Sequence, residues 1–225
     1  NTAGVSTDYD FTVDYSATGS SLTSGDTITV TFPDGYDLST VTDGDITSSD
    51  FAIQSTDLSG ADGSGTETVG ITVDESVSSQ VSFNIASVSN PESSTDYTVN
   101  VDDNQNDGTG SDTISIAPAS HEGYLVEPAS TTQTAGSSFN VDIKAVDQYN
   151  NIVTDIDTTL NGYSYTFSDP SNAPDGTTPT FPDGSNPSFS SGVWSTTSTT
   201  LVKSEDTTLT VEDDQSTPAT GTSST

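Results

Sequence analysis

The residues best suited to hold a ligand lie in one acidic loop, Asp102-Asp103-Asn104-Gln105-Asn106-Asp107-Gly108-Thr109-Gly110-Ser111-Asp112. Oxygen ligands at alternate positions followed by a glycine are typical of a calcium-binding loop, because Ca²⁺ prefers oxygen ligands. Asp103, Gln105, Asp107 and Gly108 approximate the first half of such a loop. The bidentate glutamate that closes it is missing, because Ile114 falls at that position.

Two interpretations of this loop stay open. In one, it binds calcium through Asp102, Asp103, Asp107 and Asp112, and calcium is the only metal or cofactor that the sequence suggests. In the other, which we favour, it is a solvated hairpin loop in an acid-rich chain.

The side chains needed for most enzymatic chemistry are missing or isolated. The chain has no cysteine, which excludes disulfides, thiolate metal sites and cysteine catalysis. A Ser-His-Asp triad would depend on His121, the single histidine, which lies beside Glu122 where the two halves of the chain meet. We interpret His121 as an exposed linker residue. The sequence therefore predicts that the chain is not an enzyme, with no catalytic and no cofactor-binding residues.

The charge of the chain is strongly one-sided. It has 34 acidic residues and two basic ones, Lys144 and Lys203, for a net charge of −32. Two cations cannot neutralise a phosphate backbone, so nucleic acid is excluded as a partner, and no apolar run is long enough for insertion into a membrane. Molar salt shortens the Debye length to about 3 Å and relieves the self-repulsion of such a chain. The charge thus indicates a halophilic, haloarchaeal source and a fold that unfolds below about 1 M salt.

The hydroxyl content points to the outside of the cell. The chain has 38 serines and 40 threonines, and we expect an extracellular protein of the cell surface. It has no Asn-x-Ser/Thr acceptor for N-glycans, since the proline of Asn186-Pro187-Ser188 disqualifies that sequence. The Ser/Thr clusters at 196–200 and 220–225 remain possible positions for O-linked glycans.

Apolar and polar residues alternate along the first half, which predicts β-strands with one buried face. The apolar sets are Tyr9, Phe11, Val13 and Tyr15; Ile28, Val30 and Phe32; Val69, Ile71 and Val73; Val81, Phe83 and Ile85; Tyr97, Val99 and Val101; and Ile114 with Ile116. No segment has a helical period. Short strands separated by Gly, Asp, Ser and Pro clusters predict a β-sandwich.

The second half repeats this pattern. Its expected strands are Tyr124 to Val126; Phe139, Val141, Ile143 and Ala145; Tyr163, Tyr165 and Phe167; Val193-Trp194 to Leu201; and Leu209 with Val211. Four prolines make 169–186 a stiff loop, and Trp194 is expected in the core. The sequence thus predicts an all-β protein with two Ig-like β-sandwich domains in series, 1–118 and 119–213, and a Ser/Thr-rich tail or linker at 214–225.

A stretch of the second half resembles a known family. Thr-Ala-Gly-Ser-Ser-Phe-Asn-Val-Asp-Ile-Lys-Ala-Val-Asp-Gln-Tyr-Asn-Asn-Ile-Val-Thr-Asp, residues 134–155, is similar to the core signature of bacterial Ig-like domains of the invasin and adhesin type. Asn150 stands where the family has glycine in its Asp-x-x-Gly-Asn turn, and asparagine tolerates the left-handed backbone that this turn needs. The resemblance implies an Ig-like fold, a place on the cell surface and no catalytic residues.

Comparison of the two halves raises a hypothesis about assembly. Thr2-Ala3-Gly4 precedes a strand as Thr134-Ala135-Gly136 does, but only the second half has a strand, at 124–126, before this turn. Domain 1 would then lack its first strand, and a strand from a neighbouring subunit would fill the open edge. The assembly residues are Asn1, Thr2, Ala3, Gly4, Tyr9 and Phe11. The alternative is a sandwich that never had this strand, or a chain that is an excerpt.

The function expected from these observations is structural. We expect a subunit or repeat of a surface filament, pilus-like fibre or surface layer, in which copies of the chain join head to tail. The alternative is an adhesin-type binding module that recognises carbohydrate or a cell surface. Exposed aromatic residues at one end of a sandwich would favour this alternative, with Tyr149, Tyr163 and Tyr165 as the candidates.

Overall fold

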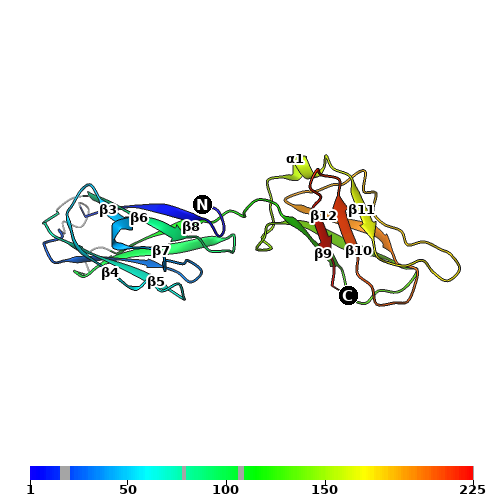
Figure 1. Ribbon diagram of the computed structural model, residues 1–225, viewed down its shortest axis with the longest axis horizontal. Coiled ribbons are helices and arrows are strands. Elements are labelled where there is room, and N and C mark those ends of the chain that lie inside the picture. Colours follow the sequence, from blue (N-terminus) through cyan, green and yellow to red (C-terminus); the bar gives the residue numbers. More distant parts are fainter. Residues whose placement is uncertain (16–20, 78–79, 106–108, 225) are drawn as a thin grey trace. The chain divides into compact units, whose positions relative to one another are not determined.

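The computed structural model describes residues 1–15, 21–77, 80–105 and 109–224, and it consists mainly of β-strands (Figure 1). The chain divides into two compact units, Asn1–Ala117 and Pro118–Thr225, called unit 1 and unit 2 below. The predicted boundary lies one residue later, after Pro118. All strand pairs of the sheets are antiparallel, so the predicted all-β class is confirmed.

Unit 1 contains two sheets. Its strands are β1 (Ser6–Asp14), β2 (Thr27–Phe32), β3 (Ile46–Ser48), β4 (Ile53–Gly60), β5 (Glu67–Val73), β6 (Gln80–Ser89), β7 (Asp96–Asp103) and β8 (Thr109–Ser115). One sheet has the order β1-β6-β3 and the other β4-β5-β2-β7-β8. The predicted alternation is confirmed, because the inward residues of β2, β5 and β6 form one buried cluster.

Two strands of unit 1 were not predicted. β4 carries register shifts between Ile53 and Ser55 and between Asp57 and Gly60, and such bulges break the period of two on which the prediction rested. β3 has only three residues, which is too few to show a period. A 3-10 turn, Asp43–Asp45, precedes it.

Unit 2 also contains two sheets. Its elements are β9 (Gly123–Pro128), β10 (Ser138–Val146), the single turn α1 (Asp157–Leu160), β11 (Tyr165–Ser168), β12 (Val193–Thr200), β13 (Thr210–Asp213) and β14 (Thr220–Thr222). One sheet has the order β12-β10-β9 and the other β11-β13-β14. Trp194 is buried among Tyr165, Phe167 and Phe189, as predicted.

The prediction of a strandless tail from residue 214 is wrong. β14 pairs with β13 through Val211↔Gly221, and the buried Ser223 donates its N–H to the carbonyl of Leu209 at 3.0 Å. The segment was missed because its inward positions are glycine and serine, whose burial depends on the neighbouring backbone and not on their own apolar surface.

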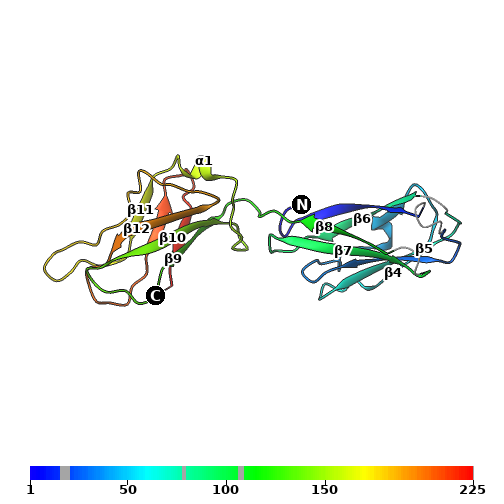
Figure 2. The same ribbon diagram turned by 180° about the vertical axis from the view of Figure 1, so that it is seen from behind.

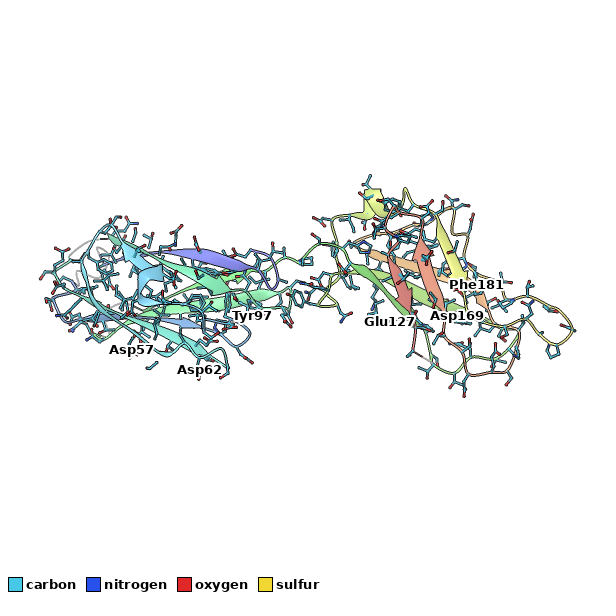
Figure 3. All side chains as sticks on the ribbon, viewed as in Figure 1. Asp57, Asp62, Tyr97, Glu127, Asp169 and Phe181 are labelled. Atoms are coloured by element: carbon cyan, nitrogen blue, oxygen red, sulfur yellow. The ribbon has the colours of Figure 1, made fainter. Side chains whose placement is uncertain are left out.

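The long loop between β11 and β12 has no strand of four residues or more, as its prolines predicted. Phe181 of this loop stacks on Phe167 with ring centroids 5.8 Å apart, and Figure 3 labels Phe181 beside β11. The predicted turn at Asn150 is confirmed, since its φ is +65°. Asp147 accepts hydrogen bonds from the N–H groups of Tyr149 and Asn151, both at 2.9 Å, and so holds this turn. The described residues include no helix with the length and apolarity to span a membrane.

Candidate binding groove in unit 1

A groove of about 790 Å³ lies in unit 1 between two strands that end their sheets. Residues 9–15, from β1 onward, line one side, and residues 109–112 of β8 line the other. In the described part of the chain, β1 belongs to a ladder with β6 alone and β8 to a ladder with β7 alone. Figure 1 shows β1 in dark blue and β8 in green, and Figure 2 shows β7 beside β8 from behind. One edge of each strand can therefore take up a further strand.

Main-chain hydrogen bonds join the two sides of the groove near the N-terminus. Thr2 and Ala117 form an isolated parallel bridge. Ala3 donates its N–H to the carbonyl of Ala117, and Ala117 donates to the carbonyl of Asn1, both at 2.9 Å. Gly4, with φ +64°, donates to the carbonyl of Pro91 at 3.1 Å.

The predicted assembly residues therefore fall into two groups. The first group already forms main-chain contacts within unit 1 and consists of Thr2, Ala3 and Gly4. Asn1, Tyr9 and Phe11 line the groove. The prediction located one side of the groove and missed the other side, which β8 supplies.

The floor of the groove is the incompletely covered margin of the core. Phe11, Val13, Val101 and Ile114 pack against the buried cluster of unit 1 but remain half-exposed. Phe11 stacks on Phe83 with ring centroids 5.2 Å apart. A segment that covers these four side chains would remove apolar surface from water, which contributes roughly 25 cal/mol per Å².

The inner face of β8 differs from an ordinary core face. In the β7–β8 ladder, Ile114 lies opposite Tyr97, Asp112 opposite Val99 and Gly110 opposite Val101. Cross-strand partners share one face of a sheet, so Asp112 and Gly110 face inward with Val99. A Cβ atom at Gly110 would meet nothing within 4 Å.

The strands of the two units correspond in length and in irregularity. β1 and β10 both have nine residues and both follow a Thr-Ala-Gly turn. The β1–β6 ladder shifts register between Thr7 and Tyr9, and the β10–β12 ladder shifts between Phe139 and Val141. Counted from their first residues, these shifts fall at the same place. β1 thus corresponds to β10, and β6 to β12.

The neighbours of these two strands are different. β10 lies between β12 and β9, whereas β1 has β6 on one side and no ladder partner on the other within the described chain. The vacant side of β1 corresponds to the side of β10 that β9 occupies. The groove therefore lies at the place that β9 occupies beside β10 in unit 2.

A glycine marks the same position in both units. Val211 lies opposite Gly221 in unit 2, as Val101 lies opposite Gly110 in unit 1. A Cβ atom at Gly221 would lie 2.1 Å from the carbonyl oxygen of Tyr124, because β9 passes directly over it. Gly110 keeps this small residue type where no strand passes.

A buried aspartate is the last residue of both β13 and β7. Asp213 is 3% exposed and Asp103 is 5% exposed. Each accepts an N–H hydrogen bond from the glutamine two residues later, at 3.2 Å from Gln215 and 3.0 Å from Gln105. The hydroxyl of Tyr124 in β9 donates to Asp213 at 2.6 Å. The corresponding strands thus share a side-chain pattern as well as a path.

Hydrogen bonds decide the pKa of Asp213. Burial by itself would raise the pKa of this carboxyl group, but hydrogen bonds from Tyr124, Gln215 and Ala219 outweigh burial and lower it. Burial, with the hydrogen bond to Asp213 as the next cause, raises the pKa of Tyr124 far above its ordinary value. The pair is therefore a carboxylate and a neutral phenol at neutral pH.

The candidate calcium ligands do not converge in the described structure. Asp102 faces away from the groove opposite Thr109, whereas Asp112 lies opposite Val99. The two carboxylates are therefore about 10 Å apart along the hairpin. Asp103 is buried beside Gln105, and Asp107 lies outside the described residues. Among the described residues, no three Asp, Glu, His or Cys side chains are placed to hold a metal ion together.

The prediction of an exposed linker histidine is wrong. His121 is half-buried in unit 2, where its ring lies 4.9 Å from the ring of Tyr124. Its Nε2 is 3.0 Å from the carbonyl oxygen of Gly123. Burial lowers the pKa of His121. The segment before His121 is held in unit 2, because Ala119 donates its N–H to Asp147 at 2.8 Å.

The aromatic residues considered for carbohydrate binding are not exposed together. Tyr165 is buried in the core of unit 2, Tyr163 packs against that core, and Tyr149 is half-buried in its turn. Among the described residues, the only large hydrophobic side chain that is well exposed is Val5, at 47%. No stacking surface for a sugar ring is present in that part of the chain.

Comparisons with known proteins give distant structural similarity. No protein-family model and no curated protein matches the sequence. The C-terminal domain of the Streptococcus agalactiae AgI/II polypeptide BspA is similar over 100% of this chain and 94% of its own, at 12% identity and a TM-score of 0.36. The Escherichia coli adhesin FdeC is similar over 99% of this chain and 66% of its own, at 18% identity and a TM-score of 0.26. The Yersinia pseudotuberculosis protein InvD is similar over 88% of this chain and 52% of its own, at 12% identity and a TM-score of 0.28.

Proposed function

We propose that the chain is a binding module of a cell surface that takes up an extended polypeptide segment in the groove of unit 1. The observation that carries this proposal is the vacant edge of β1, at the place that β9 fills beside β10. An added strand would form main-chain hydrogen bonds along β1, as β9 does along β10, and would cover the partly exposed apolar floor beside β8.

The two units have different roles in this proposal. Unit 1 is the acceptor. Unit 2 is closed by its own strands, because β9 and β14 approach each other at Tyr124 and Gly221. Unit 2 is a spacer that needs no partner to complete its sandwich.

The place on the cell surface rests on composition. A chain rich in serine, threonine and aspartate, with two lysines, remains hydrated and repels similar surfaces. We propose the outer surface of a halophile as its location. Protease treatment of intact cells tests this location: the chain should be cleaved while cytoplasmic markers remain intact.

A peptide taken from the chain tests the acceptor role. The probe is a labelled peptide with the sequence of residues 121–130, which includes β9, with Glu127→Gln to remove a charge. We expect it to bind the full chain and to protect the amides of residues 10–14 in β1 from hydrogen exchange. Binding without protection of these residues would contradict the proposal.

A substitution in the groove provides the control. Gly110→Val places a branched side chain where the added strand must pass, so binding of the peptide should be lost. Gly44→Val, in the 3-10 turn Asp43–Asp45, where a Cβ atom would come no closer than 3.8 Å to Oγ1 of Thr42, should leave binding unchanged. If Gly110→Val binds the peptide as well as the unmodified chain does, the groove is not the acceptor.

A further inference from the structure

We infer that the groove of unit 1 selects a partner strand that runs antiparallel to β1 and carries a lysine or arginine opposite Asp10. This inference rests on the proposed function and identifies the partner strand as a basic segment from outside this sequence. It follows from the correspondence between the vacant edge of β1 and the β9–β10 ladder.

The path of the partner strand follows from unit 2. β9 runs antiparallel to β10, with Tyr124 opposite Ala145, Val126 opposite Ile143 and Pro128 opposite Val141. Tyr124 and Val126 are buried in the core of unit 2, and Pro128 continues the same alternation along β9. The same path in unit 1 places three alternate residues of the partner opposite Val13, Phe11 and Tyr9.

These three positions favour apolar side chains. Tyr9 is buried, and Phe11 and Val13 are half-exposed at the margin of the core. The space beside Gly110 is open to 4 Å, so the residue opposite Val13 can be large, as Tyr124 is in unit 2. The partner therefore has apolar residues at alternate positions.

The outward positions set the charge of the partner. In unit 2, Glu127 lies opposite Asp142, and the repulsion between them is offset because Lys144 lies 2.5 Å from Glu127. In unit 1, Asp10 corresponds to Asp142, and Thr12 replaces the lysine. An acidic residue opposite Asp10 would be repelled without compensation, whereas a basic residue would form a cross-strand ion pair.

The carboxylates around the groove also favour a basic residue on the partner strand. Asp10, Asp14 and Asp112 all line the groove. Asp10 is held in place on the outer face, since Asn84 donates its Nδ2–H to Asp10 at 2.9 Å. Unit 1 contains no lysine or arginine.

A second copy of this chain does not meet these requirements. The whole chain has two basic residues, Lys144 and Lys203, and each is paired with a glutamate of unit 2. Lys144 lies in β10, the middle strand of its own sheet, and cannot enter another molecule's groove without unfolding unit 2. Every other segment of residues 1–225 is neutral or acidic, so the partner strand comes from outside this sequence.

Two peptides test the selection of charge. Both have the sequence of residues 121–130, and one carries Glu127→Lys. We expect the lysine peptide to bind the full chain about 3- to 10-fold more tightly than the glutamate peptide at the lowest salt at which the chain stays folded, as attraction replaces repulsion across the ladder. The difference should shrink in 3 M KCl, because screening removes it.

A charge reversal in the groove makes the test specific. Asp10→Lys should reverse the preference, so that the glutamate peptide binds more tightly. Asp102→Lys, the same change of charge on the face of β7 away from the groove, should leave the preference for lysine in place. Far-UV circular dichroism verifies that both variants are folded.

The outcomes separate this inference from the proposed function. Equal binding of the two peptides, with strand protection retained, overturns the charge selection and leaves the acceptor role standing. Binding of neither peptide, nor of the neutral one, overturns both. Self-association of the chain through residues 10–14 in the absence of peptide would show that a second copy is the occupant and would also overturn the inference.

Discussion

The two units follow one plan of strands and differ in a single occupant. In unit 2, β9 covers the side of β10 and closes the sandwich against β14. In unit 1, β1 and β8 surround an empty groove at the corresponding place. An open edge of a sandwich can therefore be recognised by two features: a glycine without a close neighbour, and partly exposed apolar residues on the flanking strand.

The charge of the two units differs as well. Unit 1 has 20 acidic residues and no basic one, and unit 2 has 14 acidic residues and both lysines. The unit with the open groove is therefore also the unit with the larger uncompensated charge. Both features would be relieved by a basic strand in the groove.

Substitution of the two corresponding glycines, Gly110 and Gly221, should give the largest difference in stability between the units. Gly221→Val would bring a Cβ atom 2.1 Å from the carbonyl oxygen of Tyr124, so unit 2 should lose at least ~3 kcal/mol and can fail to fold. Gly110→Val should change the stability of unit 1 by less than about 0.5 kcal/mol. Trp194 is the only tryptophan, so its fluorescence follows the unfolding of unit 2, while circular dichroism follows both units. Equal losses at the two glycines would refute the comparison.

Truncation of corresponding core side chains should give the next largest difference in stability between the units. Ile143→Ala removes a fully buried side chain from β10 and should cost unit 2 about 2–5 kcal/mol. Phe11→Ala, at the corresponding place in β1, should cost unit 1 only about 1–2 kcal/mol, because the ring is already half-exposed. Denaturant titrations of both variants in the same salt measure the two losses. A larger loss for Phe11→Ala would mean that the groove margin is part of a complete core.

Acid should act on unit 2 through Asp213. The folded pKa of this group is lowered, so its contribution is complete above the unfolded pKa of about 3.9 and is lost as the pH falls through the folded pKa. Asp213→Asn should therefore cost about 1–3 kcal/mol at pH 7 and little once the carboxyl group is protonated. Tryptophan fluorescence during denaturation at several pH values measures this difference. A loss that is independent of pH would exclude the carboxylate as its cause.

Unit 1 contains a carboxyl group with the opposite response. Glu67 is fully buried, and burial raises its pKa against the hydrogen bonds that it accepts from Leu38 and Gly63. A raised pKa penalises the folded state above that pKa, and the penalty disappears as the pH falls. Glu67→Gln should stabilise unit 1 at pH 7 by less than about 1 kcal/mol and have the smaller effect in acid. Destabilisation of unit 1 at pH 7 would show that the charged form is required.

The smallest effect should come from the outer face of the paired strands. Thr12→Lys places in unit 1 the charge that Lys144 supplies in unit 2, and it should stabilise unit 1 by no more than about 1 kcal/mol. The gain should be largest at the lowest salt at which the chain stays folded and should shrink as salt is added, because screening weakens the charge interactions. Thermal unfolding at two such salt concentrations measures it, and a gain that does not change with salt would argue against an electrostatic origin.

The strands were largely predictable because their alternation is local. Each inward set, such as Ile28, Val30 and Phe32, is visible within a few residues of sequence. β4 was missed because its bulges interrupt the alternation, and β14 because a glycine and a serine occupy its inward positions. Both strands are defined by what lies across the sheet, which the sequence does not display.

The binding groove was only half predictable. The absence of a strand before Thr2-Ala3-Gly4 indicated an open edge, and Tyr9 and Phe11 were placed on it. β8 was not identified as the other side, although Thr109-Gly110 and Thr220-Gly221 repeat the same pair after similar acidic runs. That repeat was the available signal, and its meaning depends on the opposite strand in each ladder.

By itself, the sequence determined the all-β class and the excess of acid, because composition and period-two alternation are local properties of the chain. Tertiary structure decided which edges stay open. Whether a strand has one neighbour or two depends on residues far along the chain, and in unit 2 it depends on β9 and β14, which lie some 90 residues apart. At Gly221, β9 passes so close that no larger residue fits, whereas at the corresponding Gly110 a larger side chain has room. Only the fold distinguishes the two glycines.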